Sequence, residues 1–305
     1  MHKLEIAPEN EVYDALIIGR GPAGIQAALH LARAGHKVVI VGDAPGSLAL
    51  AEKIENYYGL PEPLSGAELQ KIGERQARSF GVGICGCQVV GFNFLDDGAY
   101  KIIADNREFI AKSVLIATGA RRSKAPVDGV GRYEGRGVSY CAVCDGFLYR
   151  GKNVGVLGYA QYALAEAREL TPLIGGVTIF TNGNRPEFVI GPGGADPERY
   201  KVVTDPIEGL EGDDKLTGVR FKNGEARAID ALFVAYGAAT GTDLAKKLGV
   251  LLNAQGYIIT DGDQATNVPG VYAAGDCTGA FKQVAVAVGQ GAIAARAMGG
   301  HIRSL

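Results

Sequence analysis

Two spacings of apolar residues alternate along the chain, and they predict strands and helices in turn. An apolar run from Tyr13 to Ile18 leads into a glycine-rich turn, after which apolar residues recur every three or four positions, at Ile25, Ala28, Leu29, Leu31 and Ala32. A second apolar run extends from Lys37 to Val41. A short continuous run is typical of a buried strand, and the wider spacing is typical of one face of a helix. The pattern therefore predicts strand, glycine turn, helix and strand.

The same unit occurs again in the middle of the chain. Asn153 to Leu157 predicts a strand, residues 158–163 a glycine turn, the segment through Leu170 a helix, and Val177 to Phe180 a second strand. A repeated mononucleotide-binding unit predicts an α/β fold with two Rossmann-like dinucleotide-binding domains, the second inserted in the first.

The segments on either side of the second unit predict the rest of the first domain. The expected elements are a helix from Gly66 to Phe80, strand-like segments from Val82 to Phe94 and from Tyr100 to Ala104, an apolar strand from Ser113 to Ala120, a short strand within 270–276 and a helix from about Gln283 to Met298. We therefore expect one discontinuous domain of residues 1–122 and 238–305, with residues 123–237 as the inserted domain.

The first glycine turn has the residues of a dinucleotide site. Gly19, Gly21 and Gly24 follow the spacing Gly-x-Gly-x-x-Gly between a predicted strand and a predicted helix. Without side chains at these positions, the backbone can approach a pyrophosphate at the helix N-terminus. Asp43, nineteen residues after Gly24, stands at the end of the second strand, where it can hold a ribose hydroxyl. Because strand, helix and acid agree, dinucleotide binding is a better interpretation than a fortuitous glycine turn.

A redox-active pair is predicted between the two units. Cys141 and Cys144 form a Cys-x-x-Cys motif, and Asp145 follows directly. Such a pair closes a small disulfide that electrons can open and that can exchange with a partner. The alternatives are two buried cysteines or half of a zinc site. Zinc needs four ligands, and the other cysteines, Cys85, Cys87 and Cys277, supply no second Cys-x-x-Cys, so no metal site is expected.

Composition and charge exclude several classes of protein. The net charge of −2 argues against a nucleic-acid partner, because backbone binding needs a strong positive excess. No apolar run approaches the roughly 18 to 20 residues that span a bilayer, and the first residues lack the apolar core of a signal peptide. Five cysteines, an odd number, do not suggest a secreted disulfide framework. We therefore expect a cytoplasmic protein with no membrane or nucleic-acid partner.

Over essentially its whole length the chain resembles the low-molecular-weight thioredoxin reductases, which are two-domain flavoprotein disulfide reductases. The matching runs are residues 19–24, 54–56, 117–120, 141–147, 274–276 and 282–283. The resemblance implies an FAD-containing homodimer whose flavin passes electrons to the Cys141–Cys144 disulfide and on to thioredoxin. The positions that it assigns to the cofactor are Gly19, Gly21, Pro22, Ala23, Gly24, Asp43, Gly46, Ser47, Asn56, Ala117, Thr118, Gly119, Gly275, Asp276, Lys282, Gln283 and Val284.

The resemblance also implies separate roles for the residues of the redox motif. Cys144 would face the flavin and form a charge-transfer pair as its thiolate, and Cys141 would attack the disulfide of the partner. Asp145 would be the acid–base group, since a neighbouring carboxyl can deliver the proton that a departing thiolate needs. A plain helix cap is the alternative role for Asp145.

The second glycine turn departs from that family. These enzymes bind NADPH in the inserted domain through a second Gly-x-Gly-x-x-Ala and an arginine pair after the next strand. Here Ala160 replaces the middle glycine, and its methyl group crowds the place of the pyrophosphate. Thr181-Asn182-Gly183 stands where the arginine pair would be and cannot pair with a 2′-phosphate. We expect that NADPH binding is lost, with a variant site that binds NADPH weakly as the alternative.

The same losses mark the ferredoxin-dependent flavin thioredoxin reductases, and resemblance to this subgroup implies ferredoxin as the electron donor. A relative with a second flavin in place of the nicotinamide is the alternative. Between Arg121 and Lys152, seven basic and three acidic residues give 7 − 3 = +4, in a chain of net charge −2. Ferredoxins are generally acidic, so a positive surface would speed their encounter, although it would equally suit thioredoxin.

Two other functions stay open from the sequence. Related flavoproteins oxidise small dithiols and pass the electrons to oxygen, and a flavin-bearing redox sensor would use the same fold with slow turnover. Asp145, directly after the Cys-x-x-Cys, favours the reductase. Of the other cysteines, Cys85 and Cys87 are expected in the core on one strand, and Cys277 is expected to behave as a small hydrophobic residue.

Overall fold

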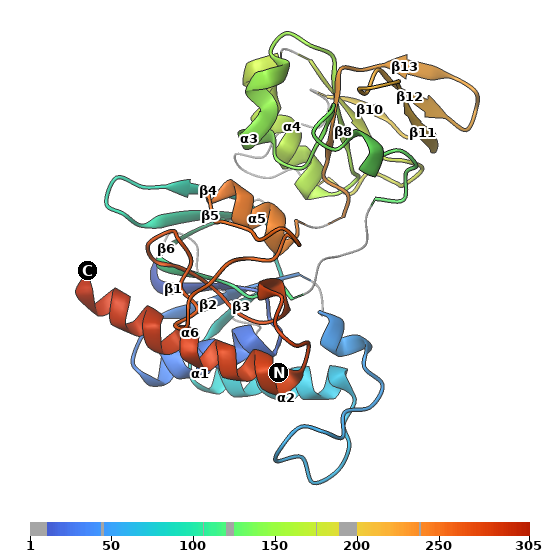
Figure 1. Cartoon of the computed structure of the whole chain (residues 1–305). Coiled ribbons are helices and arrows are strands. Elements are labelled where there is room, and N and C mark those ends of the chain that lie inside the picture. Colours follow the sequence, from blue (N-terminus) through green and yellow to red (C-terminus); the bar gives the residue numbers. More distant parts are fainter. Residues whose placement is uncertain are drawn as a thin grey trace. The chain divides into compact units, whose positions relative to one another are not determined.

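The computed structural model describes residues 11–43, 46–105, 107–119, 125–174, 176–188, 200–237 and 239–305. The chain forms two compact units: the first comprises Met1–Arg121 and Thr240–Leu305, and the second Arg122–Ala239. Figure 1 shows the elements of each unit. Both units contain parallel sheets with helices, so the predicted α/β class is confirmed.

The first unit is built on one mixed sheet. Its strand order is β3-β2-β1-β6-β5-β4, and β15 also pairs with β6. The parallel strands are β1 (Val12–Ile18), β2 (Val38–Val41), β3 (Gly83–Cys85), β6 (Arg107–Ile116) and β15 (Val271–Ala273). The antiparallel strands are β4 (Val89–Phe94) and β5 (Tyr100–Ala104). The apolar run at β1 is buried as expected, and its carboxyl end leads directly into the first glycine turn.

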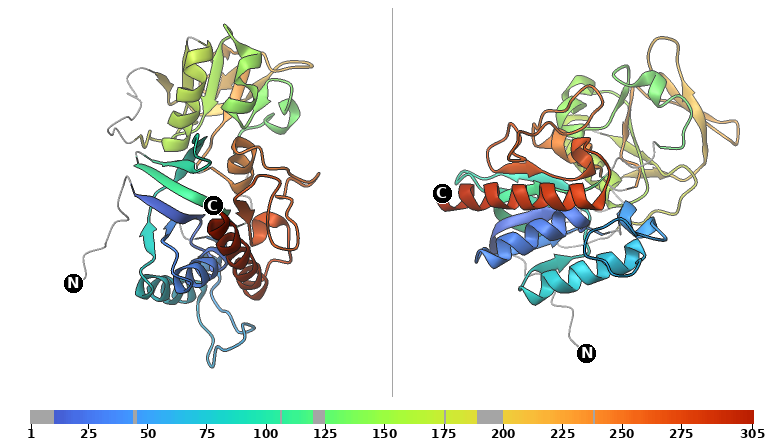
Figure 2. Two further views of the ribbon diagram at one scale, coloured as in Figure 1. Left: turned by 90° about the vertical axis from the view of Figure 1, so that its left-hand side faces the viewer. Right: turned by 60° about the horizontal axis from the view of Figure 1, so that its bottom comes forward.

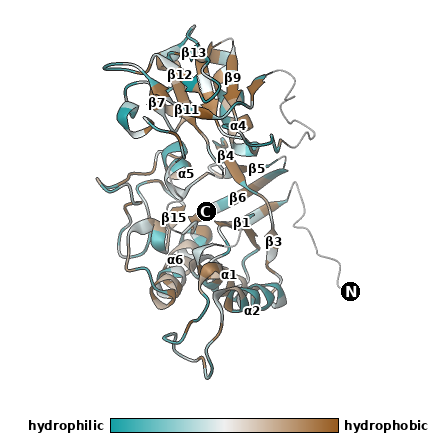
Figure 3. Ribbon diagram, turned by 90° about the vertical axis from the view of Figure 1, so that its right-hand side faces the viewer, coloured by the Kyte–Doolittle hydropathy of each residue, from teal (hydrophilic) through white to brown (hydrophobic). Residues whose placement is uncertain are grey.

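Helices α1 (Pro22–Arg33) and α6 (Val284–Ser304) lie side by side against this sheet (Figure 2). They approach closely because both present small residues, and a Cβ added at Gly291 of α6 would lie 2.2 Å from the carbonyl oxygen of Ala23 on α1. Helix α2 (Gly66–Ser79) is largely hydrophilic along its ribbon (Figure 3). The remaining helices of this unit are η1 (Ser47–Leu50), α5 (Gly241–Lys247) and η5 (Asp276–Thr278).

The second unit has a parallel sheet of order β10-β9-β8-β14-β7 and a separate antiparallel sheet of order β11-β12-β13. The parallel strands are β7 (Val138–Ser139), β8 (Val154–Leu157), β9 (Val177–Phe180), β10 (Lys201–Val203) and β14 (Ala231–Val234). The antiparallel strands are β11 (Ile207–Glu211), β12 (Gly218–Phe221) and β13 (Ala226–Ala228). The helices are η2 (Gly131–Tyr133), α3 (Ala142–Asp145), η3 (Gly146–Tyr149) and α4 (Gln161–Ile174). The repeated strand–turn–helix–strand is therefore present in both units.

Three predicted boundaries in the first unit are wrong, and in the second unit the helix predicted through Leu170 continues to Ile174. The segment from Val82 to Phe94 forms two strands, because residues 86–88 leave the sheet between β3 and β4. The strand expected from Ser113 begins six residues earlier and ends at Ile116, since 107–111 pair with β5. The last helix continues past Met298 to Ser304, because Gly299 and Gly300 do not interrupt it. Within the described residues, no helix is long and apolar enough to cross a membrane.

The contact between α1 and α6 gives a matched pair of substitutions on one helix. Gly291→Ala places a methyl group against the backbone of Ala23, and we expect it to destabilise the protein by about 2 kcal/mol. Gly289→Ala adds the same group where nothing lies within 4 Å, so the higher helix propensity of alanine should stabilise by up to about 1 kcal/mol. Denaturant unfolding of both variants measures the difference, and equal effects would contradict the close helix contact.

Candidate functional site

The first glycine turn joins β1 to α1 and leaves the start of the helix open. Gly21 is the N-cap residue, with no side chain to cap the helix, and Pro22 follows at its first position. The first turn of α1 contains no acidic residue. The free N–H groups of a helix start, with no competing carboxylate, suit an anion such as a pyrophosphate.

Close backbone approach explains the glycines at the two ends of this turn. Gly19 has φ of +110°, and a Cβ there would lie 2.3 Å from the carbonyl oxygen of Ala117 at the end of β6. A Cβ at Gly24 would lie 2.1 Å from the carbonyl oxygen of Gly19, whereas Gly21 has nothing within 4 Å. Gly19 and Gly24 are therefore needed for packing, and Gly21 leaves open space.

The carboxyl ends of β1, β6 and β15 bring three predicted cofactor segments together. Besides the contact of Gly19 with Ala117, a Cβ at Gly275 would lie 3.2 Å from the side chain of Ala23. Thr118 follows Ala117, and its buried hydroxyl oxygen has no hydrogen-bond partner within the described part of the chain. A buried polar atom of this kind is normally satisfied by a group that binds at the site.

Two polar contacts join further predicted residues. The Asn56 side-chain amide donates to the Gln283 side-chain oxygen at 3.1 Å, which links the loop before α2 to the start of α6. The Arg20 guanidinium donates to the backbone oxygen of Asp43 at 3.1 Å. The sequence patterns had placed these pairs far apart along the chain, and the fold brings them together.

Asp276 and Lys282 interact by charge between β15 and α6. Partial burial raises the pKa of the Asp276 carboxyl, and the neighbouring Lys282 opposes that rise. Cys277, the next residue, is buried, and its burial raises the pKa of the thiol to about 12. Cys277 is thus a protonated, inert side chain under physiological conditions, in agreement with its expected role as a small hydrophobic residue.

The remaining predicted cofactor positions lie at element ends. Gly46 and Ser47 are exposed at the start of η1, Gly119 follows Thr118 with φ of +76°, and Val284 is the first residue of α6. Ala120, the last residue of that matching run, lies outside the described residues.

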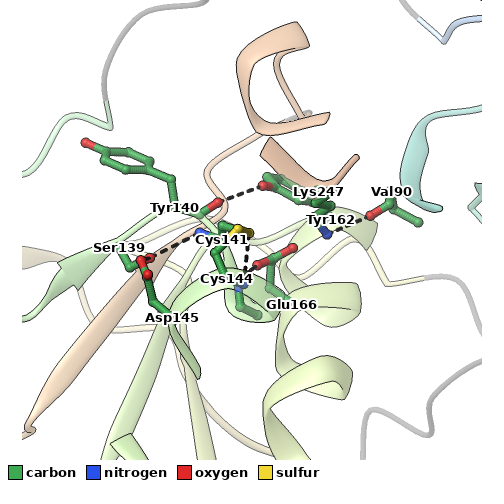
Figure 4. The surroundings of a disulfide bond; sticks show 10 residues. Val90, Ser139, Tyr140, Cys141, Cys144, Asp145, Tyr162, Glu166 and Lys247 are labelled. Carbon is green, nitrogen blue, oxygen red and sulfur yellow. Dashed lines mark hydrogen bonds between the residues drawn. A yellow bond between two sulfur atoms is a disulfide. The ribbon is translucent and has the colours of Figure 1, made fainter. Parts of the chain in front are cut away.

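The second unit carries the redox motif on a short helix after β7. Cys141 and Cys144 are joined in a disulfide, with Cys141 at the N-cap of α3 and Cys144 inside it (Figure 4). The Cys141 side chain is only 2 % exposed, whereas Cys144 is exposed. Solvent therefore reaches the second cysteine of the motif in this conformation.

Ser139 connects the motif to its carboxylate. Its hydroxyl donates to the Asp145 carboxylate at 2.6 Å and accepts the backbone N–H of Cys141 at 3.2 Å (Figure 4). Asp145 is also close enough to Tyr149 to help raise the pKa of that phenol, after the larger effect of burial. The carboxylate makes no side-chain cap at the start of η3, so the alternative role of Asp145 as a cap of that helix is not observed.

Glu166 of α4 fixes the other side of the motif. It is 1 % exposed, and its carboxylate accepts the backbone N–H of Ala142, the residue after Cys141, at 2.7 Å (Figure 4). A carboxylate bonded to a backbone amide makes a stronger hydrogen bond than a neutral acceptor does. Glu166 therefore holds the start of α3 against α4.

The second glycine turn, between β8 and α4, is bonded to a later segment of the chain. The backbone N–H of Glu187 donates to the carbonyl oxygen of Tyr159 at 2.7 Å, and Glu187 forms an isolated bridge with Ala160. The ring of Tyr159 packs edge-on against Tyr236, with ring centroids 5.3 Å apart. The carbonyl oxygen of Tyr159 in this turn is therefore bonded to residue 187, and the methyl group of Ala160 stands where the first turn has Gly21.

The loop that follows β9 is locked by its own polar groups. Thr181, which is fully buried, donates to the backbone oxygen of Asn184 at 2.7 Å, and the Asn184 amide donates to Tyr236 at 2.7 Å. The Asn182 side-chain oxygen accepts the N–H of Ile207 at 2.7 Å. These positions, where an arginine pair was expected in the family, hold the loop in place, and the nearest cation in the loop is the exposed Arg185.

Sequence patterns missed Ser139, Glu166 and Glu187 because their partners are set by the fold. One sequence feature could have identified Glu166: it is a carboxylate among the small apolar residues of a helix face that is predicted to be buried. Gln290 was also missed, and its side-chain oxygen accepts the N–H of Gly275 at 2.8 Å.

Comparison with known proteins agrees with this geometry. The family model of pyridine nucleotide-disulphide oxidoreductases matches residues 13–189 and 201–291. A thioredoxin reductase of Aquifex aeolicus is 34% identical over 95% of this chain and 93% of its own. Among solved structures, the atypical thioredoxin reductase TRi of Desulfovibrio vulgaris Hildenborough is 40% identical, covers 96% of this chain and 98% of its own, and has a TM-score of 0.88.

A ferredoxin-flavin thioredoxin reductase of Clostridium acetobutylicum is 31% identical, covers 96% of this chain and 99% of its own, and has a TM-score of 0.69. The resemblance inferred from the sequence motifs is thus confirmed at the level of the family. This chain belongs to the pyridine nucleotide-disulphide oxidoreductases, among the low-molecular-weight thioredoxin reductases, and is an oxidoreductase enzyme.

Proposed function

We propose that this enzyme uses FAD and the Cys141–Cys144 disulfide to reduce a thioredoxin, with ferredoxin rather than NADPH as its electron donor. The observation that carries the proposal is the contrast between the two glycine turns: Gly21 leaves open space at the start of α1, whereas Ala160 places a methyl group at the corresponding position before α4. The first turn can hold the FAD pyrophosphate, and the second is crowded for that of NADPH.

The residues of the first unit fit FAD. The uncapped start of α1 and the open space at Gly21 suit the pyrophosphate, and Asp43 at the end of β2 suits a ribose. Thr118, with its unpaired buried hydroxyl, and the Asn56–Gln283 pair supply polar groups for the rest of the cofactor. We therefore assign FAD binding to the first unit and the redox motif to the second. FAD, when bound and reduced by the electron donor, would supply the two electrons that open the disulfide.

Side chains around the disulfide can bind and release the protons that this reaction requires. Two electrons and two protons convert the enzyme disulfide to two thiols. Exchange with a thioredoxin disulfide then re-forms the enzyme disulfide and leaves the thioredoxin as a dithiol. Asp145, bonded to Ser139 beside Cys141, is placed to hold or release a proton at a sulfur. Glu166 keeps the motif in position through the backbone of Ala142.

The two cysteines of the redox motif differ in solvent exposure. A mixed disulfide requires an accessible thiolate, and Cys144 is exposed whereas Cys141 is buried. This favours Cys144 as the sulfur that meets thioredoxin, the opposite order from the one that the resemblance implies. The large apolar side chains Val143, Phe147 and Leu148 are 58–62% exposed beside it, which suits a protein partner.

Ferredoxin is supported by the name of one similar structure and by charge. That relative is a ferredoxin-flavin thioredoxin reductase. Of the basic residues between 121 and 152, Arg121, Arg122 and Lys124 lie outside the described residues. Arg132 and Arg136 donate to backbone oxygens, whereas Arg150 and Lys152 are exposed just after η3. We further propose a homodimer, as the resemblance implies, and a cytoplasmic location, as the composition leads us to expect.

The cysteine order can be tested by trapping thioredoxin. Both Cys141→Ser and Cys144→Ser should abolish turnover, because each leaves a single thiol. Cys141→Ser should accumulate a stable mixed disulfide through Cys144, and Cys144→Ser should accumulate far less, since Cys141 is buried. Non-reducing gels and peptide mass mapping measure the yield. Trapping by Cys144→Ser alone would restore the order implied by the resemblance.

The donor can be tested by the flavin spectrum of the anaerobic holoenzyme. Reduced ferredoxin should bleach the flavin rapidly, whereas millimolar NADPH should bleach it little and slowly. Arg185→Ala is the comparison variant, because it removes the cation of the loop after β9 that is nearest to residues 181–183 and that could attract NADPH there. Fast stoichiometric bleaching by NADPH that Arg185→Ala weakens would show that the second turn still binds the nucleotide and would refute the proposed donor.

Charge reversal tests the docking of ferredoxin. The double variant Arg150→Glu with Lys152→Glu should slow flavin reduction by ferredoxin, and the wild-type rate should fall as ionic strength passes about 0.1 M, where the screening length is roughly 10 Å. Lys222→Glu, at an exposed site on the β12–β13 hairpin, is the control, and dithionite is the reference reductant. Equal slowing with dithionite would mean damage to the flavin site and would contradict docking at these residues.

A further inference from the structure

We propose that Arg20, inside the first glycine turn, is a positioning residue that holds Asp43 toward the adenosine ribose of the cofactor. The inference rests on the proposed FAD site and deepens it, because the glycine motif requires no particular side chain at the position of Arg20. Three observations support it: the bond between Arg20 and the end of β2, the second carboxylate beside the guanidinium, and the charges around Asp43.

The main chain that leaves β2 lies directly against the glycine turn. A Cβ added at Gly42 would lie 3.4 Å from the Cα atom of Gly19 and 3.5 Å from the backbone nitrogen of Arg20. One residue later, the backbone oxygen of Asp43 accepts a hydrogen bond from Nη2 of Arg20 at 3.1 Å. Arg20 therefore fixes the main chain of Asp43 relative to the turn. Asp43 itself is exposed, so that a ligand can reach its carboxylate.

A second carboxylate orients the guanidinium from helix α2. Nε of Arg20 lies 3.7 Å from the Glu74 carboxylate, and the two side chains are 22% and 21% exposed. The Gln70 side-chain amide donates to the same Glu74 oxygen at 3.1 Å. A long ion pair between partly exposed side chains contributes little to stability. Its main effect is to restrict the guanidinium to the space between α2 and the end of β2.

Asp43 has a negative neighbour, and the cofactor brings more negative charge. Burial raises the pKa of the Asp105 carboxyl, the hydrogen bond that it accepts from the backbone of Gln88 opposes this rise, and the charge of Asp43 adds to it. Asp43 and Asp105 are thus close enough to repel each other, and a diphosphate in the glycine turn would repel both. Arg20 offsets part of this repulsion, since a guanidinium stays charged at every physiological pH.

The ligand group that suits this arrangement is a ribose with free hydroxyl groups. A carboxylate accepts hydrogen bonds, and ribose hydroxyls can donate to it. A phosphate on the ribose would instead meet the negative charge of Asp43. Arg20 acts through Asp43 and not on a reacting atom, so its effect belongs to the affinity for the adenosine end of FAD.

The test measures what the apoprotein gains from the ribose hydroxyls. ADP is the adenosine diphosphate part of FAD, and 2′,3′-dideoxy-ADP lacks both hydroxyls. By titration calorimetry, the wild type should bind ADP about tenfold more tightly than the dideoxy compound, the effect of a hydrogen bond to a charged group. The two affinities should be nearly equal in Asp43→Ala, and the ratio should fall below about threefold in Arg20→Ala.

Arg75→Ala is the matched control, because it removes an exposed arginine of α2 next to Glu74. Its affinity ratio should stay at the wild-type value. Arg20→Lys keeps a charged donor and should retain more of the ratio than Arg20→Ala, and circular dichroism checks that each variant is folded. A wild-type ratio in Arg20→Ala, an equal fall in Arg75→Ala, or no preference for ADP in the wild type would overturn the inference. An apoprotein that binds neither ADP nor FAD would refute the proposed cofactor as well.

Discussion

The hydrogen bond from the Glu187 amide to the Tyr159 carbonyl oxygen joins the glycine turn of the second folding unit to a later segment of the chain. In both units a strand runs through a glycine turn into a helix, and that arrangement by itself favours a bound phosphate. In the second unit the N–H of residue 187 bonds to the carbonyl oxygen of Tyr159 at 2.7 Å, and Ala160 adds a methyl group beside it. At the first turn, Gly21 leaves open space instead.

This difference connects the sequence changes to a physical cause. Ala160 adds a methyl group at the turn, and Asn182, within the segment that stands in place of the family's arginine pair, bonds to the backbone N–H of Ile207. The neighbouring Asn184 donates to Tyr236, so these polar groups hold the loop after β9. The redox disulfide needs none of these groups, because Ser139 and Glu166 hold it from β7 and α4. The position of the disulfide is therefore fixed independently of the second glycine turn.

The sequence was sufficient for features that depend on local spacing. The spacing of apolar residues and the positions of the glycines predict the two strand–turn–helix–strand units and the α/β class. The Cys-x-x-Cys motif predicts the pairing of Cys141 with Cys144. Contacts between distant segments could not be predicted, and these include Asn56 with Gln283, Glu166 with Ala142 and Glu187 with Tyr159. The break of the strand at Cys85 was missed because the apolar run continues through Cys87, whereas Asp105 bonds to the backbone of Gln88 and turns the chain out of the sheet.

Hydrogen exchange at the Glu187 amide tests most directly whether the second turn is closed. We predict that this amide exchanges slowly, and at the same rate with and without NADPH, because its hydrogen bond to Tyr159 is already present in the free protein. The amides of Ala23 and Gly24, at the first turn, should become protected when FAD is added to the apoprotein. Fast exchange at Glu187, or a change there and at the start of α4 on addition of NADPH, would contradict the closed turn.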